Sequence, residues 1–96
     1  MAVNHMVWLK FNEGVAQSRK DDHIDALRSL RGPIPGIVDL TLGENFTDRA
    51  NGYSHALVVT LVDRAALGVY AAHPHHVEVA SALRQDAQLL VMDYEF

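Results

Sequence analysis

Four stretches of the chain show the residue pattern of β-strands, and they cover residues 3–11, 37–43, 53–62 and 89–96. The first stretch shows it most clearly, because one side consists of apolar residues and a histidine, and half of the residues on the other side are also apolar. One side carries Val3, His5, Val7, Leu9 and Phe11, and the other carries Asn4, Met6, Trp8 and Lys10. We therefore predict a strand with apolar groups on both faces.

Two helical regions separate these strands. Within residues 15–31, Ile24, Leu27 and Leu30 recur at helical spacing while charged residues lie mostly outside, which predicts an amphipathic helix. The run Gly32-Pro33-Ile34-Pro35-Gly36 ends it. The second region has two pieces, because Asp63 can cap one helix and Pro74 suits the first turn of the next. The apolar stripe of the last piece is His76, Val79, Ala80 and Leu83.

The predicted order is strand, helix, strand, strand, helix in two pieces, strand. This order is typical of the α+β ferredoxin-like (βαββαβ) arrangement, a four-stranded antiparallel sheet with helices on one face. The other face would then expose side chains drawn from Met6, Trp8, Val38, Leu40, Leu42 and Val58. A solvent-exposed apolar patch of this kind is uncommon on a monomer. We therefore expect two sheets to pack face to face in a homodimer, with Trp8 at the interface.

Composition narrows the possible functions. The chain has 96 residues, the length of one domain, and 49% of them are hydrophobic, which agrees with a face covered by another subunit. No cysteine is present, so disulfides and thiolate metal sites are excluded. The net charge is −4 with scattered Lys and Arg, which argues against nucleic acid as a partner. No apolar run is long enough to span a membrane, and we expect a cytoplasmic protein.

Side chains that can exchange protons are concentrated in residues 70–77, where Tyr70 and three of the six histidines surround Pro74. Histidine exchanges protons near neutral pH, so His76 on an inward helix face is a candidate general base. Tyr70 would then hold or protonate a developing oxyanion. His5 and His55 share the inward side of the first and third strands, and we expect them to face one pocket. The alternative for each of these residues is a core side chain with satisfied hydrogen bonds.

The remaining histidines have less specific interpretations. His73 precedes Pro74 and is expected to cap the helix or shape the turn. His75 is expected to be exposed, and His23 lies at the margin of the first helix's inner face. His73, His75 and His76 could also bind zinc or nickel, but neighbouring histidines on a helical turn diverge and no carboxylate follows at i+4. We predict neither a metal site nor a cofactor.

Several segments together resemble the stress-responsive A/B barrel (Dabb) family. They are His5-Met6-Val7-Trp8-Leu9-Lys10-Phe11, Pro35-Gly36-Ile37, Gly43-Glu44-Asn45, Tyr53-Ser54-His55-Ala56-Leu57-Val58-Val59-Thr60, Tyr70-Ala71-Ala72-His73-Pro74-His75-His76-Val77 and Val91-Met92-Asp93-Tyr94. The resemblance runs through the chain in order without a large insertion, so residues 1–96 are expected to form one such domain. It implies a dimeric α+β barrel.

The resemblance also implies a type of chemistry, because the family includes plant polyketide cyclases that close a ring by aldol chemistry without a cofactor. Carried over by position, the catalytic histidine falls on His76, its tyrosine partner on Tyr70, and the supporting strand histidines on His5 and His55. Those cyclases have a further tyrosine on the first helix, where this chain has only Ile24, Ala26 and Leu27. The resemblance therefore does not extend to the substrate.

The leading hypothesis is a homodimer with a histidine- and tyrosine-lined pocket for a small carbonyl-bearing or polyketide-like ligand, with cofactor-free cyclase- or lyase-type proton transfer. One alternative is a non-catalytic stress-related dimer that binds a metabolite or has a structural role. Another is cofactor-independent oxygenase chemistry, which rests on fold analogy alone.

Overall fold

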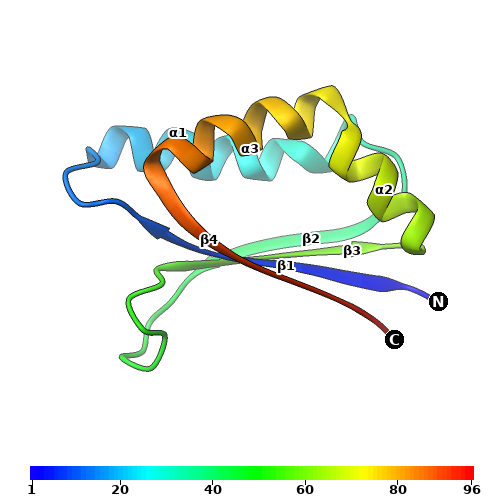
Figure 1. Cartoon of the computed structure of the whole chain (residues 1–96), viewed down its shortest axis with the longest axis horizontal. Coiled ribbons are helices and arrows are strands. Elements are labelled where there is room, and N and C mark those ends of the chain that lie inside the picture. Colours follow the sequence, from blue (N-terminus) through cyan, green and yellow to red (C-terminus); the bar gives the residue numbers. More distant parts are fainter.

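The computed structural model describes residues 1–96 and has two layers, with all helices on one face of a single sheet (Figure 1). This is the ferredoxin-like α+β fold predicted above. The elements are β1 (Val3–Phe11), α1 (Gln17–Arg28), a 3-10 turn (Ser29–Arg31), β2 (Ile37–Glu44), β3 (His55–Leu61), α2 (Arg64–Ala72), α3 (Pro74–Asp86) and β4 (Ala87–Glu95).

The four strands are antiparallel and follow the order β2-β3-β1-β4, so β1 and β3 are the central pair, as the ferredoxin-like arrangement implies. Val7 marks the middle of the sheet, because it lies opposite Leu57 on one side and Val91 on the other. β3 begins two residues later than predicted, since residues 50–53 form a turn in which the Tyr53 amide donates to the Ala50 carbonyl. β4 begins two residues earlier, at Ala87, which lies opposite Phe11.

The core lies between the sheet and the helices. Its largest fully buried side chains are Tyr70, Leu9, Leu30, Leu57, Leu61, Leu83, Val3 and Val59. Leu40 and Leu42 also pack against this cluster, so the expectation that they emerge on the opposite face is wrong. The cause is a shift in register between Ile37 and Asp39, which changes the side to which the rest of β2 points.

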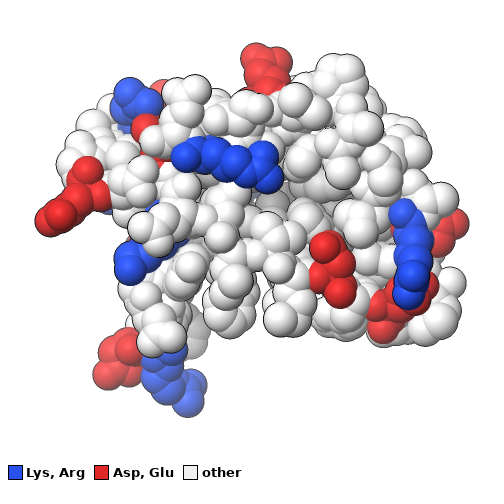
Figure 2. All heavy atoms as spheres, viewed as in Figure 1, with Lys and Arg blue, Asp and Glu red and all other residues white.

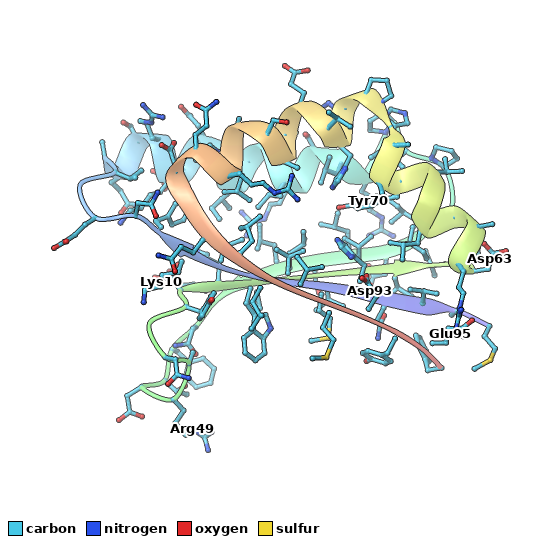
Figure 3. All side chains as sticks on the ribbon, viewed as in Figure 1. Lys10, Arg49, Asp63, Tyr70, Asp93 and Glu95 are labelled. Atoms are coloured by element: carbon cyan, nitrogen blue, oxygen red, sulfur yellow. The ribbon has the colours of Figure 1, made fainter.

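The second face of the sheet carries no helix, and we call it the open face. Trp8 from β1 is 41% exposed there, and Met92 from β4 is 65% exposed. Val58, Leu90 and Tyr94 share this side by register. Figure 3 shows large side chains hanging below the sheet, and Figure 1 shows the β2–β3 loop extending to the same side. An apolar surface of this extent is uncommon on a monomer.

The turns around α2 and α3 position these two helices on the same face of the sheet (Figure 1). The Asp63 carboxylate accepts from the Ala66 amide at 2.8 Å and caps α2, as predicted. His73 Nδ1 accepts from the His75 amide at 3.2 Å and caps α3, and Pro74 begins that helix. Gly36 has a φ of +85°, and a Cβ there would lie 2.8 Å from the Ala66 Cβ, so β2 and α2 approach closely.

None of the helices has the length and hydrophobicity required to cross a membrane.

Candidate active site

A cavity of about 180 Å³ lies between the sheet and helices α2 and α3. Most of its lining is apolar, and its titratable side chains are His5 from β1, Tyr70 from α2, and His76 and Arg84 from α3. Val7, Leu27, Leu57, Ala71, Val79, Ala80, Leu83, Leu89 and Val91 complete the wall. The structure therefore brings together three of the four predicted site residues, each from a different element.

Tyr70 lies between the two histidines. Its ring centroid is 5.3 Å from that of His5 and 4.4 Å from that of His76. The residue is only 1% exposed, yet its hydroxyl has no hydrogen-bond partner in the protein and is not sealed from the cavity. Burial raises the pKa of Tyr70 to about 12. The phenol therefore stays protonated at neutral pH and can donate to a bound ligand.

His76 is held in one orientation by the turn that joins α2 to α3. Its Nδ1 lies 3.0 Å from the carbonyl oxygen of Ala71. A carbonyl only accepts, so Nδ1 carries the proton and the neutral ring keeps a lone pair on Nε2. Burial lowers the pKa of His76 below 6.5, and the bond to Ala71 offsets this only in part. At neutral pH the ring is uncharged and Nε2 can accept a proton.

The third member, His5, has a partner that the sequence did not predict. Its Nδ1 lies 2.5 Å from the carboxylate oxygen of Asp93, which is directly opposite on β4. This bond orients the imidazole and leaves Nε2 without a protein partner. Asp93 shares the parity of Leu89 and Val91 in the last strand, so the alternation pattern contained a signal for its position on the side of His5, although the sequence analysis did not use it. What the sequence did not reveal was that β4 pairs with β1 in this register.

His55 lies apart from this group. It lines a separate, polar cavity of about 470 Å³ with Lys20, Arg28 and Glu44, and its Nδ1 is 2.8 Å from the Ser54 hydroxyl. Along β3, His55 is four residues from Val59, the residue opposite His5. Four strand residues span roughly 13 Å. The expectation that His5 and His55 face one pocket is therefore wrong.

The other histidines have structural partners. His75, which was expected to be exposed, is half-buried, and its Nε2 lies 2.9 Å from the Ser29 hydroxyl. His23 lies 2.7 Å from the Asp86 carboxylate. His73, His75 and His76 thus point to three different partners, and no three potential metal-ligating side chains are grouped in the structure.

Comparison with known proteins agrees with this architecture. A family model described as the stress responsive A/B barrel domain matches residues 3–96. Olivetolic acid cyclase of Cannabis sativa is 30% identical over 97 residues, which cover 98% of this chain and 96% of the cyclase.

Two solved structures show the same fold. A dimeric ferredoxin-like protein of unknown function from Jannaschia sp. CCS1 is 27% identical, with a TM-score of 0.86 over 100% of both chains. Hydroxynitrile lyase from Passiflora edulis has a TM-score of 0.90 over 97% of this chain and 91% of the lyase. The lyase is 22% identical, so that likeness concerns the fold alone.

Proposed function

This chain belongs to the stress responsive A/B barrel domain family, and from that premise we propose that it is a homodimer catalysing cofactor-free proton transfer on a small carbonyl compound. One observation carries the catalytic part of the proposal. The Tyr70 side chain is buried, and its hydroxyl, which has no hydrogen-bond partner within the protein, reaches a cavity that also contains two histidines. Because no buried side-chain polar atom of the protein lacks a partner, this hydroxyl must keep some access to the cavity, where it is free to donate to a ligand.

In the proposed reaction, Nε2 of His76 removes a proton from the carbon next to the ligand's carbonyl. The electrons of the broken C–H bond form a carbon–carbon double bond, and the carbonyl oxygen becomes negatively charged. The Tyr70 hydroxyl donates a hydrogen bond to that oxygen and stabilises it. The enolate carbon can then attack a second carbonyl of the same ligand, and the proton on His76 neutralises the alkoxide that forms. His5, oriented by Asp93, offers Nε2 as a further hydrogen-bonding group.

The volume of the cavity limits the size of the ligand that it can hold. Its volume of about 180 Å³ is below the ~300 Å³ at the lower end for drug-sized ligands. Its wall is largely apolar, so a compact and partly apolar carbonyl compound fits best. Leu27 lines the cavity from the first helix, the region where the family's cyclases have a further tyrosine. We therefore propose the same type of proton transfer as in the cyclase relative but not the same substrate.

The proposal can be tested by hydrogen exchange in D₂O. We would incubate the protein with small methyl ketones and follow loss of the α-proton signals by NMR. The expected result is exchange above the buffer rate that falls by roughly 10²- to 10⁴-fold in His76→Ala, the typical contribution of a general base. His75→Ala is the matched control, since it removes a histidine one position away that bonds Ser29 instead of facing the cavity. Equal rates in wild type and His76→Ala would refute a catalytic base.

The same experiment addresses a non-catalytic binding function. Tyr70, Leu27, Leu57 and Leu83 are all buried in the wall of the cavity, so a small ligand held there would contact apolar side chains whether or not it reacts. For a binding module, the ketones would shift the ring signals of Tyr70 and His76 without any exchange of α-protons.

The homodimer is supported by two independent observations. The open face presents Trp8, Met92 and Tyr94 to solvent with no helix to cover them. Structural neighbours with this fold are dimeric, among them the protein from Jannaschia. Packing of two open faces would cover these side chains with apolar partners.

A further inference from the structure

We propose that the polar cavity beside His55 is a second binding site, for a small carboxylate that also carries a hydrogen-bond donor, such as an α-hydroxy or α-amino acid. This site is distinct from the cavity that contains Tyr70 and His76. It lies between α1 and the corner where β2 ends and β3 begins.

The cavity has the volume of a ligand site and a different chemistry from the first one. Its volume is about 470 Å³, within the ~300–1,000 Å³ range of small-molecule pockets. Only two of its ten lining residues are hydrophobic. A ligand that fills it must therefore be mainly polar.

Charges of both signs surround the histidine, and three of them lack an oppositely charged partner. Lys20, Arg28 and Glu44 all line the cavity, and none of them takes part in the five ion pairs of the protein. One Arg28 nitrogen donates to the Leu42 carbonyl at 3.3 Å, which leaves its other N–H groups available. Figure 2 shows Lys and Arg well separated from one another on the visible face of the molecule, so that face has no broad basic patch.

His55 lies where these charges act together. Its pKa is lowered mainly by burial, while Glu44 raises it and Arg28 and Lys20 lower it. All three charged groups are therefore close enough to the ring to influence it. Its Nδ1 is occupied by the Ser54 hydroxyl at 2.8 Å, and its Nε2 has no protein partner. The imidazole can thus offer one nitrogen to a ligand.

The floor of the site is aromatic. The Phe11 ring packs edge-on against His55 with centroids 5.9 Å apart, and the Lys20 ammonium lies 5.7 Å from the Phe11 centroid. This contact holds the ammonium over the ring face by cation–π attraction. The cation is therefore positioned within the cavity and not extended into solvent.

These positions define the ligand class. Lys20 and Arg28 can bind a carboxylate through charge-assisted hydrogen bonds. Glu44 can only accept, so it requires a donor such as a hydroxyl or ammonium on the same ligand. The other carboxylate of the cavity, Asp21, accepts from the Gln17 amide at 3.0 Å. An ion that has charge but few donors, such as inorganic phosphate, would be repelled by Glu44 and Asp21, whereas a carboxylate with a neighbouring donor satisfies both sides of the cavity.

An NMR titration of the full-length ¹⁵N-labelled protein tests the proposal, with L-lactate, L-alanine, acetate and inorganic phosphate as probes. We expect saturable shifts of the Ser54 and His55 signals with lactate or alanine, and weaker binding of acetate and phosphate. Arg28→Gln should weaken lactate or alanine binding by at least tenfold. Glu44→Gln should remove the preference for either of them over acetate.

Two control variants distinguish binding in this cavity from binding to a nearby surface arginine or to the first cavity. Arg31→Gln removes an arginine close in sequence that pairs with Asp39 outside the cavity, and should leave binding unchanged. His76→Ala should also leave binding unchanged, whether or not the proposed proton transfer exists. No saturable shift with any probe, shifts confined to Tyr70 and His76, or equal binding by Arg28→Gln and wild type would each overturn the second site.

Discussion

At the scale of single residues, three histidines within four positions have three different roles. His73 caps a helix, His75 bonds Ser29, and His76 faces the cavity. The apolar stripe of α3 predicted the inward position of His76, and the structure confirms it. The tautomer of His76 was not predictable, because it depends on the Ala71 carbonyl across the α2–α3 turn. One backbone oxygen thus determines which imidazole nitrogen is available as a base.

Tyr70→Phe is expected to separate catalysis from stability. The variant removes only the hydroxyl, which bonds no protein group, so the melting temperature should stay the same or rise slightly. Ketone exchange should fall by about 10²- to 10³-fold, the typical effect of one lost oxyanion donor. Exchange kinetics and a thermal melt measure the two effects. A large fall in melting temperature would instead show that the hydroxyl supports the fold.

The pH dependence of exchange follows from the shifted pKa values. Because the pKa of folded His76 lies below 6.5, more than half of the base is neutral at pH 6.5, and exchange should fall as the pH drops further. At the alkaline end Tyr70 loses its proton only near a pKa of about 12. The rate per protein should therefore level off as the pH rises above 6.5 and stay level through the neutral range. An acid limb that remains in His76→Ala would assign the base elsewhere.

The same shift has a consequence for stability. Unfolded His76 binds a proton near pH 6.5, whereas the folded ring binds one only at lower pH. Acid therefore favours the unfolded chain, and the free energy of unfolding should decrease as the pH falls below 6.5. His55 acts in the same direction, because its pKa is also lowered. Urea titrations of wild type and His76→Ala at several pH values should show a weaker acid dependence in the variant.

At the scale of elements, one buried carboxylate joins α1 to the end of α3. Asp86 accepts from the Arg19 guanidinium at 2.7 Å and lies 2.7 Å from His23 Nε2. Its own pKa is lowered, chiefly by the bond with His23 and then by Arg19. The sequence placed His23 at the edge of the helix but gave no sign of a partner 63 residues away.

Asp86→Asn is expected to lower the melting temperature by several degrees at neutral pH. The amide cannot carry the charge that Arg19 and His23 bind, so the contact between the two helices weakens. A lowered folded pKa stabilises the protein above pH 3.8, and that stability is lost as pH falls through the folded pKa. The deficit of the variant should therefore shrink in acid. Asp25→Asn, on the exposed side of α1, is the control and should show little change.

Prediction from sequence succeeded where local periodicity determines structure and failed where distant pairing does. The order of elements and the caps at Asp63 and His73 followed from nearby residues, and the central position of β1 and β3 followed from the fold that this order implies. The shift in register near Asp39 was invisible, and it moved Leu40 and Leu42 into the core. The separation of His5 from His55 was likewise invisible, since parity gives the face of a strand but not the position along the neighbouring one.

At the scale of the whole molecule, the open face is the largest feature without a partner in the chain. Trp8→Asp places a charge in the middle of it, directly beside Ala56 and Leu90 on the neighbouring strands. Burying that carboxylate between two sheets would be costly, so the variant should be a monomer or unfold. Light scattering measures this. Val77→Asp, an exposed valine on α3, is the matched control and should remain dimeric.

Only 16 of the 96 residues are buried in a single protomer, which is a small core for a chain in which 49% of residues are hydrophobic. Part of the stability of the folded chain would then come from covering the open face with a second copy, and this association depends on protein concentration by mass action. The melting temperature of this protein should therefore rise with protein concentration. Diluting the protein should lower its melting temperature even in plain buffer, so that each chain's stability is set partly by how many copies surround it.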